Sequence, residues 1–265
     1  MTLFTWCLGL SAPTRGERPG DRAGYDRTSV AIPTCLVQTR RVPDSEDARL
    51  RGCQTQRMPE LTSPGREVTV PPPSPSARLV AWLTGVATGN DPLMVFSTIG
   101  GHRRLFRWWL PFAGSLLRGG RLARADTELL ILRTAWNCGG WYEWVQHVPL
   151  ASRAGLSSTR IAAVVEGPAH TEWTARQRLL LEAADELHGA RVVSERTWKR
   201  LSEHLTVEQG IELCFVVGHY EMLAMTLNSL GVEPEPSAVR KLDAPSASLA
   251  ARLADRLRSA RSQSL

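Results

Sequence analysis

The sequence lacks several patterns that would assign a function directly. Its five cysteines are an odd number, and no two of them form a Cys-x-x-Cys pair. A disulfide framework is therefore not expected, and neither is a zinc site, and a reducing cytoplasm is the expected compartment. No run of eighteen apolar residues stands out, and no basic segment precedes the apolar start. Neither a membrane-spanning helix nor a signal peptide is predicted.

Concentrated charge is also missing. The net charge is +6, but the basic residues are nearly all arginine, and they are scattered among acidic residues. Nucleic-acid-binding domains usually gather their positive charge into a patch or a stripe. We therefore predict no nucleic-acid partner and no membrane partner, and we expect a small-molecule substrate instead.

No segment sustains the period-two alternation of a strand, so we predict an all-α protein in three parts. Residues 1–76 form an N-terminal extension. Residues 1–57 are rich in Arg, Gly, Pro, Thr and Ser and are predicted to be disordered, because they offer too little apolar surface to offset the entropy of ordering. Met58 offers an alternative start, and a Pro-rich stretch leads to residue 76. Residues 77–232 form the helical domain, and 233–265 are expected to be a solvated tail, with a helix over 246–262 as the alternative.

Helical spacing of apolar residues defines the elements of this domain. Thr174-x-x-Gln177 and Thr206-x-x-Gln209 have the spacing of capping boxes, and Ser157 and Ser194 are expected N-caps. The predicted helices cover 77–88, a short segment after Asp91-Pro92, 102–117, 125–137, 141–154, a short segment after Ser157, 175–188, a segment after Ser194, and 207–229.

The candidate functional residues lie in the stretch 128–147. Glu128 stands at the head of an apolar helical run, and Cys138 precedes a Gly-Gly break. Glu143 and His147 are four residues apart, so they share one face of the following helix. Such a carboxylate and imidazole are suited to act as general base and general acid. Glu128 would orient His147 or relay a proton.

Several blocks of this sequence resemble the carboxymuconolactone decarboxylase family, which includes the AhpD-type alkylhydroperoxidases. They are LARADTELLILRTAW, YEWVQH, ASRAGLS, TARQRLLLEAADELH and VGHYEMLAMTLNSLGVE, and the resemblance covers roughly residues 77–232. It implies an AhpD-like helical fold and assembly as a homo-oligomer.

The resemblance also shows a departure. The peroxidase branch of the family has a Glu, then Cys-x-x-Cys, then a His four residues after the second Cys. Glu128 and His147 match the Glu and the His, but Gly140 and Glu143 stand where the two cysteines would be. Because peroxide reduction needs a reactive thiolate, this Tyr-Glu-Trp-x-x-His variant resembles the non-redox branch.

Three functions remain open at this point. The first is decarboxylase-like acid–base chemistry on a small lactone or carbonyl acid, with Glu143 and His147 catalytic, Glu128 in support, and no cofactor. The second is an AhpD-like peroxidase that uses Cys138 as nucleophile. The third is a helical oligomer that binds a small hydrophobic acid without turnover. No metal is demanded, and His219 is a weak candidate for a third ligand.

The packing of the stretch can be predicted further. Two helices joined by a short link pack antiparallel most easily. We therefore expect Glu128, Glu143 and His147 to face one cavity, with His147 less than a third exposed and nearer to Glu128 than Glu143 is. Tyr142, Trp144 and Tyr220 are expected to line the pocket.

Overall fold

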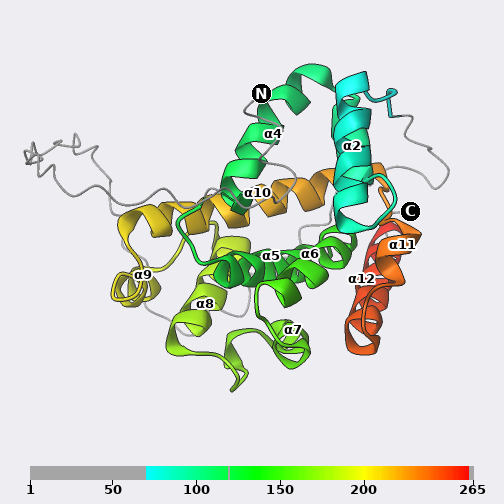
Figure 1. The fold of residues 1–265 in the computed structure, drawn as a ribbon. Helices are drawn as coiled ribbons and strands as arrows, with labels where there is room; N and C mark the ends of the chain where they lie inside the picture. Colours follow the sequence, from blue (N-terminus) through cyan, green and yellow to red (C-terminus); the bar gives the residue numbers. More distant parts are fainter. Residues whose placement is uncertain (1–69, 119, 263–265) are drawn as a thin grey trace, which may run out of the picture. The chain divides into compact units, whose positions relative to one another are not determined.

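The structure, a computed structural model, describes residues 70–118 and 120–262. All regular structure in these residues is helical, which confirms the predicted all-α class (Figure 1). The predicted disorder of residues 1–57 lies outside the described residues. The helical domain begins slightly earlier than predicted, because Ser74 caps a helix that has Pro75 at its first position.

The helices match the sequence-based ranges closely, with most ends within a few residues. Their bounds are α2 Pro75–Thr88, α3 Met94–Gly100, α4 Arg103–Arg118, α5 Arg124–Cys138, α6 Trp141–Arg153, α7 Ser158–Ala163, the 3-10 segment η2 Val164–Ala169, α8 Ala175–Ala190, α9 Glu195–Leu201, α10 Val207–Leu230, α11 Pro236–Val239 and α12 Ala244–Ser262. Both predicted capping boxes are formed, at Thr174 and at Thr206.

Helix α5 is the centre of the domain. It packs against α6, α8 and α10, and almost every residue of Asp126–Ala135 is buried. Its apolar residues divide between two core clusters: Leu130 and Ile131 face α8 and α10, whereas Leu129 and Leu132 face α6 and α12. A helix that is apolar on all sides is the expected core element of such a fold.

Helix α10 is long and apolar enough to cross a membrane, judged by length and composition alone. The prediction that no segment of that kind exists was therefore too strict. In this structure α10 packs against α5, α8, α4 and α6, and most of it is buried inside the domain (Figure 1). It also carries Glu212, His219 and Glu221. These contacts are those of the core helix of a helical domain.

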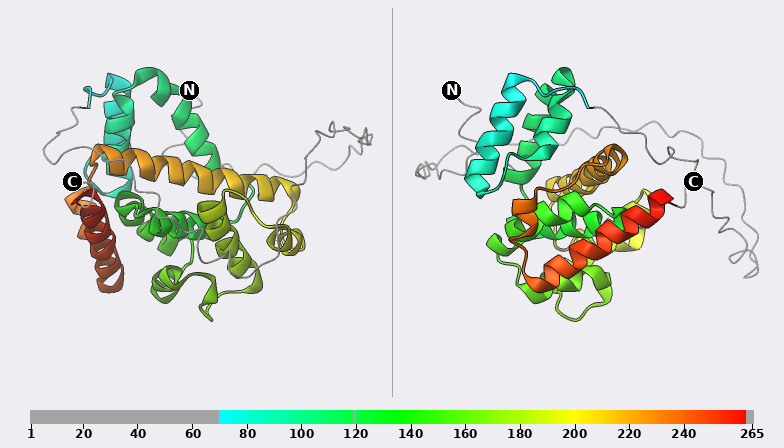
Figure 2. Two further views of the ribbon diagram at one scale, coloured as in Figure 1. Left: turned by 180° about the vertical axis from the view of Figure 1, so that it is seen from behind. Right: turned by 90° about the vertical axis from the view of Figure 1, so that its right-hand side faces the viewer.

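The C-terminal part is a correction to the sequence analysis. Residues 233–265 were expected to be a solvated tail, but α12 packs along α6 and α7 (Figure 2). Leu249 and Leu253 are buried in its contact face, as the alternative helical interpretation of 246–262 required. The apolar stripe of α12 was visible in the sequence, but the surface that it covers was not.

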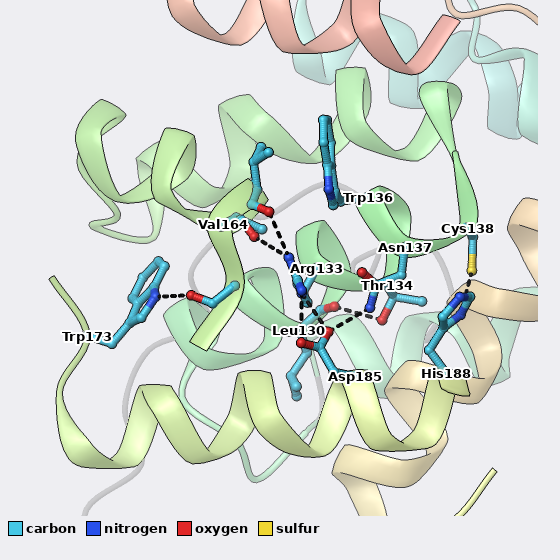
Figure 3. A network of polar contacts seen from close by, with 12 residues as sticks. Leu130, Arg133, Thr134, Trp136, Asn137, Cys138, Val164, Trp173, Asp185 and His188 are labelled. Atoms are coloured by element: carbon cyan, nitrogen blue, oxygen red, sulfur yellow. Dashed lines mark hydrogen bonds and ion pairs between the residues drawn. The ribbon is translucent and has the colours of Figure 1, made fainter. Parts of the chain in front are cut away.

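A partly buried ion pair joins the central helices. The Arg133 guanidinium donates from Nε and Nη2 to Asp185 on α8, at 2.6 and 2.8 Å (Figure 3). Its Nη1 donates to the carbonyl oxygen of Val164 at 2.7 Å, and Asn137 donates to Asp185 as well. One arginine therefore holds α5, α8 and η2 together, and the bidentate geometry makes it a strong contact.

We expect Asp185→Ala to lower the free energy of unfolding by about 2 kcal/mol, because it leaves the charge of Arg133, whose side chain is 12% exposed, without its partner. Urea unfolding measures the loss. The matched control is Asp255→Ala, which removes an exposed partner of Arg258 and should cost less than about 1 kcal/mol. Equal losses in the two variants would contradict a special role for Arg133.

Candidate active site

The candidate site is built on the turn between α5 and α6. Gly139 ends α5 in the left-handed conformation, with φ of 64°, which favours glycine. Gly140 then leads directly into α6, and the two helices pack side by side. The short link therefore runs α6 back along α5, as the sequence predicted.

A chain of three charged or titratable side chains runs along this helix pair, and two of the three, Glu128 and His147, are buried. Nδ1 of His147 lies 2.8 Å from Oε2 of Glu128, and the other oxygen of Glu128 pairs with Arg124 one turn earlier on α5. Glu128 is completely buried and His147 is 7% exposed. With the Glu128 carboxylate as the acceptor of this contact, Nδ1 of His147 is the donor, and Nε2 remains available to a ligand.

Glu143 is the other buried acid, and it stands apart from this chain. It is 1% exposed, and neither carboxylate oxygen has a hydrogen-bond partner. Burial raises the pKa of this carboxyl from 4.5 to about 7. Glu143 and His147 were predicted to act as a pair, but the hydrogen bond of His147 goes to Glu128. At neutral pH Glu143 therefore exchanges a proton easily, without a fixed partner.

Both residues line a cavity of about 220 Å³ between α2, α3, α4, α6 and α10. Its walls are mainly apolar and aromatic, and they include Trp109, Tyr142, His219 and Tyr220. The Tyr220 ring lies edge-on to the rings of both His147 and His219, with centroids 5.0 and 5.1 Å apart. Burial lowers the pKa of His219 to about 4, so its imidazole is neutral at pH 7.

Two predicted positions need correction. Glu128 does not line the cavity, because it lies behind His147 and reaches the site only through that ring. Trp144 does not line it either: it is fully buried in the other core cluster, where its indole nitrogen donates to the carbonyl of Ser246 at 3.4 Å. Tyr142 and Tyr220 lie in the wall as predicted.

Sequence reasoning missed Glu235. Glu235 lies just after the end of the predicted helical domain, at residue 232. Its side chain is nevertheless buried, and it accepts hydrogen bonds from the hydroxyl of Tyr142, from Gln146 and from the backbone of Met94. Glu235 thus fixes Tyr142 in the cavity wall. The proline-bearing segment around it gave no signal of burial.

Cys138 lies outside the cavity. It is the last residue of α5, and its thiol faces His188 of α8 at 3.7 Å. Burial, with smaller contributions from Glu221 and Glu143, raises the pKa of this thiol to about 12. Such a thiol carries almost no thiolate at neutral pH, so Cys138 is a poor nucleophile.

The cavity also does not gather metal ligands as the sequence analysis allowed. Within the part of the chain that the structure describes, the ligand atoms of Glu143, His147 and His219 do not come within 4.8 Å of one another. Among the described residues, a group of three that does so is formed by Cys138, His188 and Glu221.

Comparisons with known proteins agree with this geometry. Residues 103–186 match the carboxymuconolactone decarboxylase family, a stretch that contains α5, α6 and most of α8. No curated protein matches the chain. The match and the shared fold support a relationship of the helical domain to the carboxymuconolactone decarboxylase and AhpD-like superfamily.

Solved structures share the fold. The AhpD core of a peroxidase-related protein from Ralstonia eutropha JMP134 matches 67% of this chain and 96% of its own, with 19% identity and a TM-score of 0.59. A peroxidase-related protein from Silicibacter sp. TM1040 covers 66% and 96%, at 15% identity and a TM-score of 0.58. A cysteine-to-alanine variant of the debrominase Bmp8, in complex with 2,3,4-tribromopyrrole, covers 72% and 98%, at 13% identity and a TM-score of 0.57.

The raised pKa of Glu143 has a consequence for stability. The folded state holds the proton of Glu143 more tightly than the unfolded state does. The stability that this proton adds to the fold is therefore complete below about pH 4.5 and is lost as the pH rises through 7. Glu143→Gln cannot titrate. From about pH 4.5 to 8 its stability relative to the wild type should therefore rise, by on the order of 3 kcal/mol.

Urea unfolding of both proteins over this pH range measures the difference. The lowered pKa of His219 acts with the opposite sign, but it is present in both proteins and cancels. The exposed Glu203→Gln is the control and should show a flat difference. A flat difference for Glu143→Gln as well would mean that Glu143 titrates at its ordinary pKa.

Proposed function

We propose that this protein carries out acid–base catalysis without a cofactor on a small organic acid that contains a lactone or another carbonyl group. One observation carries the proposal: Glu143 is a buried carboxyl with no hydrogen-bond partner and a pKa of about 7, and it faces a cavity. A group that titrates near the working pH is the most effective general acid or base. Leaving a buried carboxyl without a partner is otherwise unfavourable for folding.

The proposed roles follow from the contacts. In a decarboxylation the substrate carboxylate leaves as CO₂, and the electron pair of the broken C–C bond moves onto the carbonyl oxygen. Glu143 in its protonated form donates a proton to that oxygen. The enol then returns to the ketone as His147 delivers a proton from Nε2 to carbon and Glu143 takes back the hydroxyl proton, and His147 regains its proton from solvent. Glu128 holds the imidazole in one orientation and stabilises its charged form, supported by Arg124.

The cavity favours a compact ring with an acidic group. Its walls offer aromatic faces to a planar substrate. Arg153, which lines the same cavity and is exposed at its edge, would attract a carboxylate. The similar debrominase was solved with a small ring, tribromopyrrole. A carboxylated lactone ring such as carboxymuconolactone, from which the family takes its name, is the first substrate to test.

We also propose a homo-oligomer in the cytoplasm. Helices α4 and α10 present large apolar side chains to solvent, among them Trp108, Phe112 and Phe215, and the rings of Phe112 and Phe215 pack against one another. Exposed apolar patches of this kind usually mark an interface.

Decarboxylation of carboxymuconolactone, followed as CO₂ release and loss of the substrate, tests the roles. Glu143→Gln keeps the shape and removes the titrating group, so we expect the rate to fall on the order of a hundredfold or more. His147→Ala should cost about as much, and the double variant little more, because the loss of either residue already removes the assisted reaction to which both contribute.

The controls are Glu203→Gln and His204→Ala, which change the same two residue types at exposed positions after α9. They should keep the wild-type rate. A wild-type protein that binds the acid with a raised melting temperature but does not turn it over would favour the alternative of a ligand-binding oligomer.

The peroxidase alternative makes a separate prediction. Since its pKa of about 12 keeps Cys138 protonated, the protein should consume an alkyl hydroperoxide no faster than the same concentration of free cysteine. Peroxide consumption and mass spectrometry of the sulfenic acid measure this. Rapid, stoichiometric oxidation of Cys138 would replace the acid–base proposal with a thiol peroxidase.

A further inference from the structure

A second cluster of polar side chains lies outside the cavity, where the ends of α5 and α8 meet the middle of α10. It consists of Cys138, His188 and Glu221, one from each helix. Their ligand atoms all lie within 4.8 Å of one another. Figure 3 shows the Cys138 thiol and the His188 ring pointing toward one another. The proposed catalytic roles use none of these residues.

The contacts of the cluster converge on a single atom, Nδ1 of His188. Oε1 of Glu221 lies 2.8 Å from it and Sγ of Cys138 lies 3.7 Å from it. Only one proton can occupy this nitrogen. If Nδ1 carries the proton, it donates to Glu221, and the sulfur receives no hydrogen bond from this nitrogen. If the thiol of Cys138 donates to Nδ1 instead, the nitrogen has no proton left to donate to the carboxylate. The protonation state that pairs His188 with Glu221 therefore leaves Cys138 with only a weak contact.

A metal ion would satisfy all three. Thiolate sulfur, imidazole nitrogen and carboxylate oxygen are the ligands that zinc takes in proteins. Two ligands of a tetrahedral zinc, sulfur at about 2.3 Å and nitrogen at about 2.0–2.1 Å, stand about 3.6 Å apart. The 3.7 Å between Cys138 and His188 already has this value. The contact between His188 and Glu221 would have to open by about half an ångström to reach the matching nitrogen–oxygen separation.

We propose that Cys138, His188 and Glu221 form a zinc-binding site, with a water molecule as the fourth ligand. Binding breaks the S–H bond of Cys138, releases its proton to solvent, and forms the zinc–sulfur bond. The thiolate and the carboxylate together neutralise the charge of the ion.

The surroundings of the site support this assignment. Arg191 pairs with the other oxygen of Glu221 at 2.6 Å, so Glu221 is held to offer a single oxygen. The side chain of Asn228 donates to the carbonyl oxygen of Cys138 at 3.2 Å and fixes the end of α5. The side chain of His188 is 37% exposed, which provides a route from solvent to the cluster.

Cobalt(II) binding to the full-length protein, freed of metal with a chelator and kept reduced, tests the proposal. Cobalt takes the same tetrahedral site and reports a cysteine ligand by a thiolate-to-metal charge-transfer band. We expect one ion per chain with this band, displacement by zinc, and a higher melting temperature with zinc. Absence of the band in the wild type overturns the proposal.

Matched variants locate the ligands. Cys138→Ser should abolish the charge-transfer band, whereas Cys214→Ser, at the other cysteine that the structure describes, should keep it. A band that survives in Cys138→Ser overturns the proposal. His188→Gln changes a partly exposed side chain and should weaken cobalt binding more than tenfold, on the order of what the loss of one ligand contact costs.

Circular dichroism in chelator confirms that each variant keeps its helices. If Cys138→Ser does not fold, His188→Gln decides the matter, and unchanged cobalt affinity in that variant overturns the proposal. Because the readout is metal binding, it is independent of any turnover of an organic acid by Glu143 and His147.

Discussion

The burial of Glu128 is the constraint on which the rest of the site depends. Helix α5 is apolar on nearly all sides and is surrounded by other helices, so a carboxylate within it cannot reach water. A buried carboxylate must be paired, or it becomes neutral. Arg124 supplies one partner from the same helix, and His147 supplies the other from α6. The second contact fixes how α6 is aligned along α5. It thereby also fixes the position of Glu143, which lies on α6, in the cavity wall.

The same turn carries both positions at which the peroxidase branch of the family has its cysteines. Gly140 stands at the first of these positions and Glu143 at the second. A Cβ atom at Gly140 would lie 2.7 Å from a carboxylate oxygen of Glu143, so a side chain at 140 would displace the end of the flexible Glu143 side chain. Positions 140 and 143 are therefore in direct contact across the turn. Together they leave no thiol at either position and place an acid with a pKa of about 7 beside the cavity, which is the basis of the proposed acid–base chemistry.

The sequence predicted the parts of this structure that depend on local spacing. Periodicity and capping residues placed the helices, and the short Gly139-Gly140 link predicted the antiparallel pair that brings His147 to Glu128. Contacts between distant residues were not predictable in this way. Glu235 was missed because its burial depends on Tyr142, far away in the chain, and the packing of α12 was missed because an apolar stripe does not reveal the surface that it covers. Trp144 was misplaced because it lies next to Glu143 in sequence, although adjacent residues of a helix point about 100° apart.

The same rotation lets α10 serve two sites at once. His219 and Tyr220 face the cavity, where the Tyr220 ring packs edge-on against His147. The next residue, Glu221, points in another direction, toward His188 in α8 and Arg191 just after it. A zinc ion held by Glu221 would tie α10 to the ends of α5 and α8. Since α5 and α10 together carry the groups that orient His147, such a tie would hold the Tyr220 and Glu128 contacts of that ring in register. The zinc site is thus a means of rigidity for the cavity, and this gives a physical reason for three polar residues to converge at a place that takes no part in the proposed proton transfer.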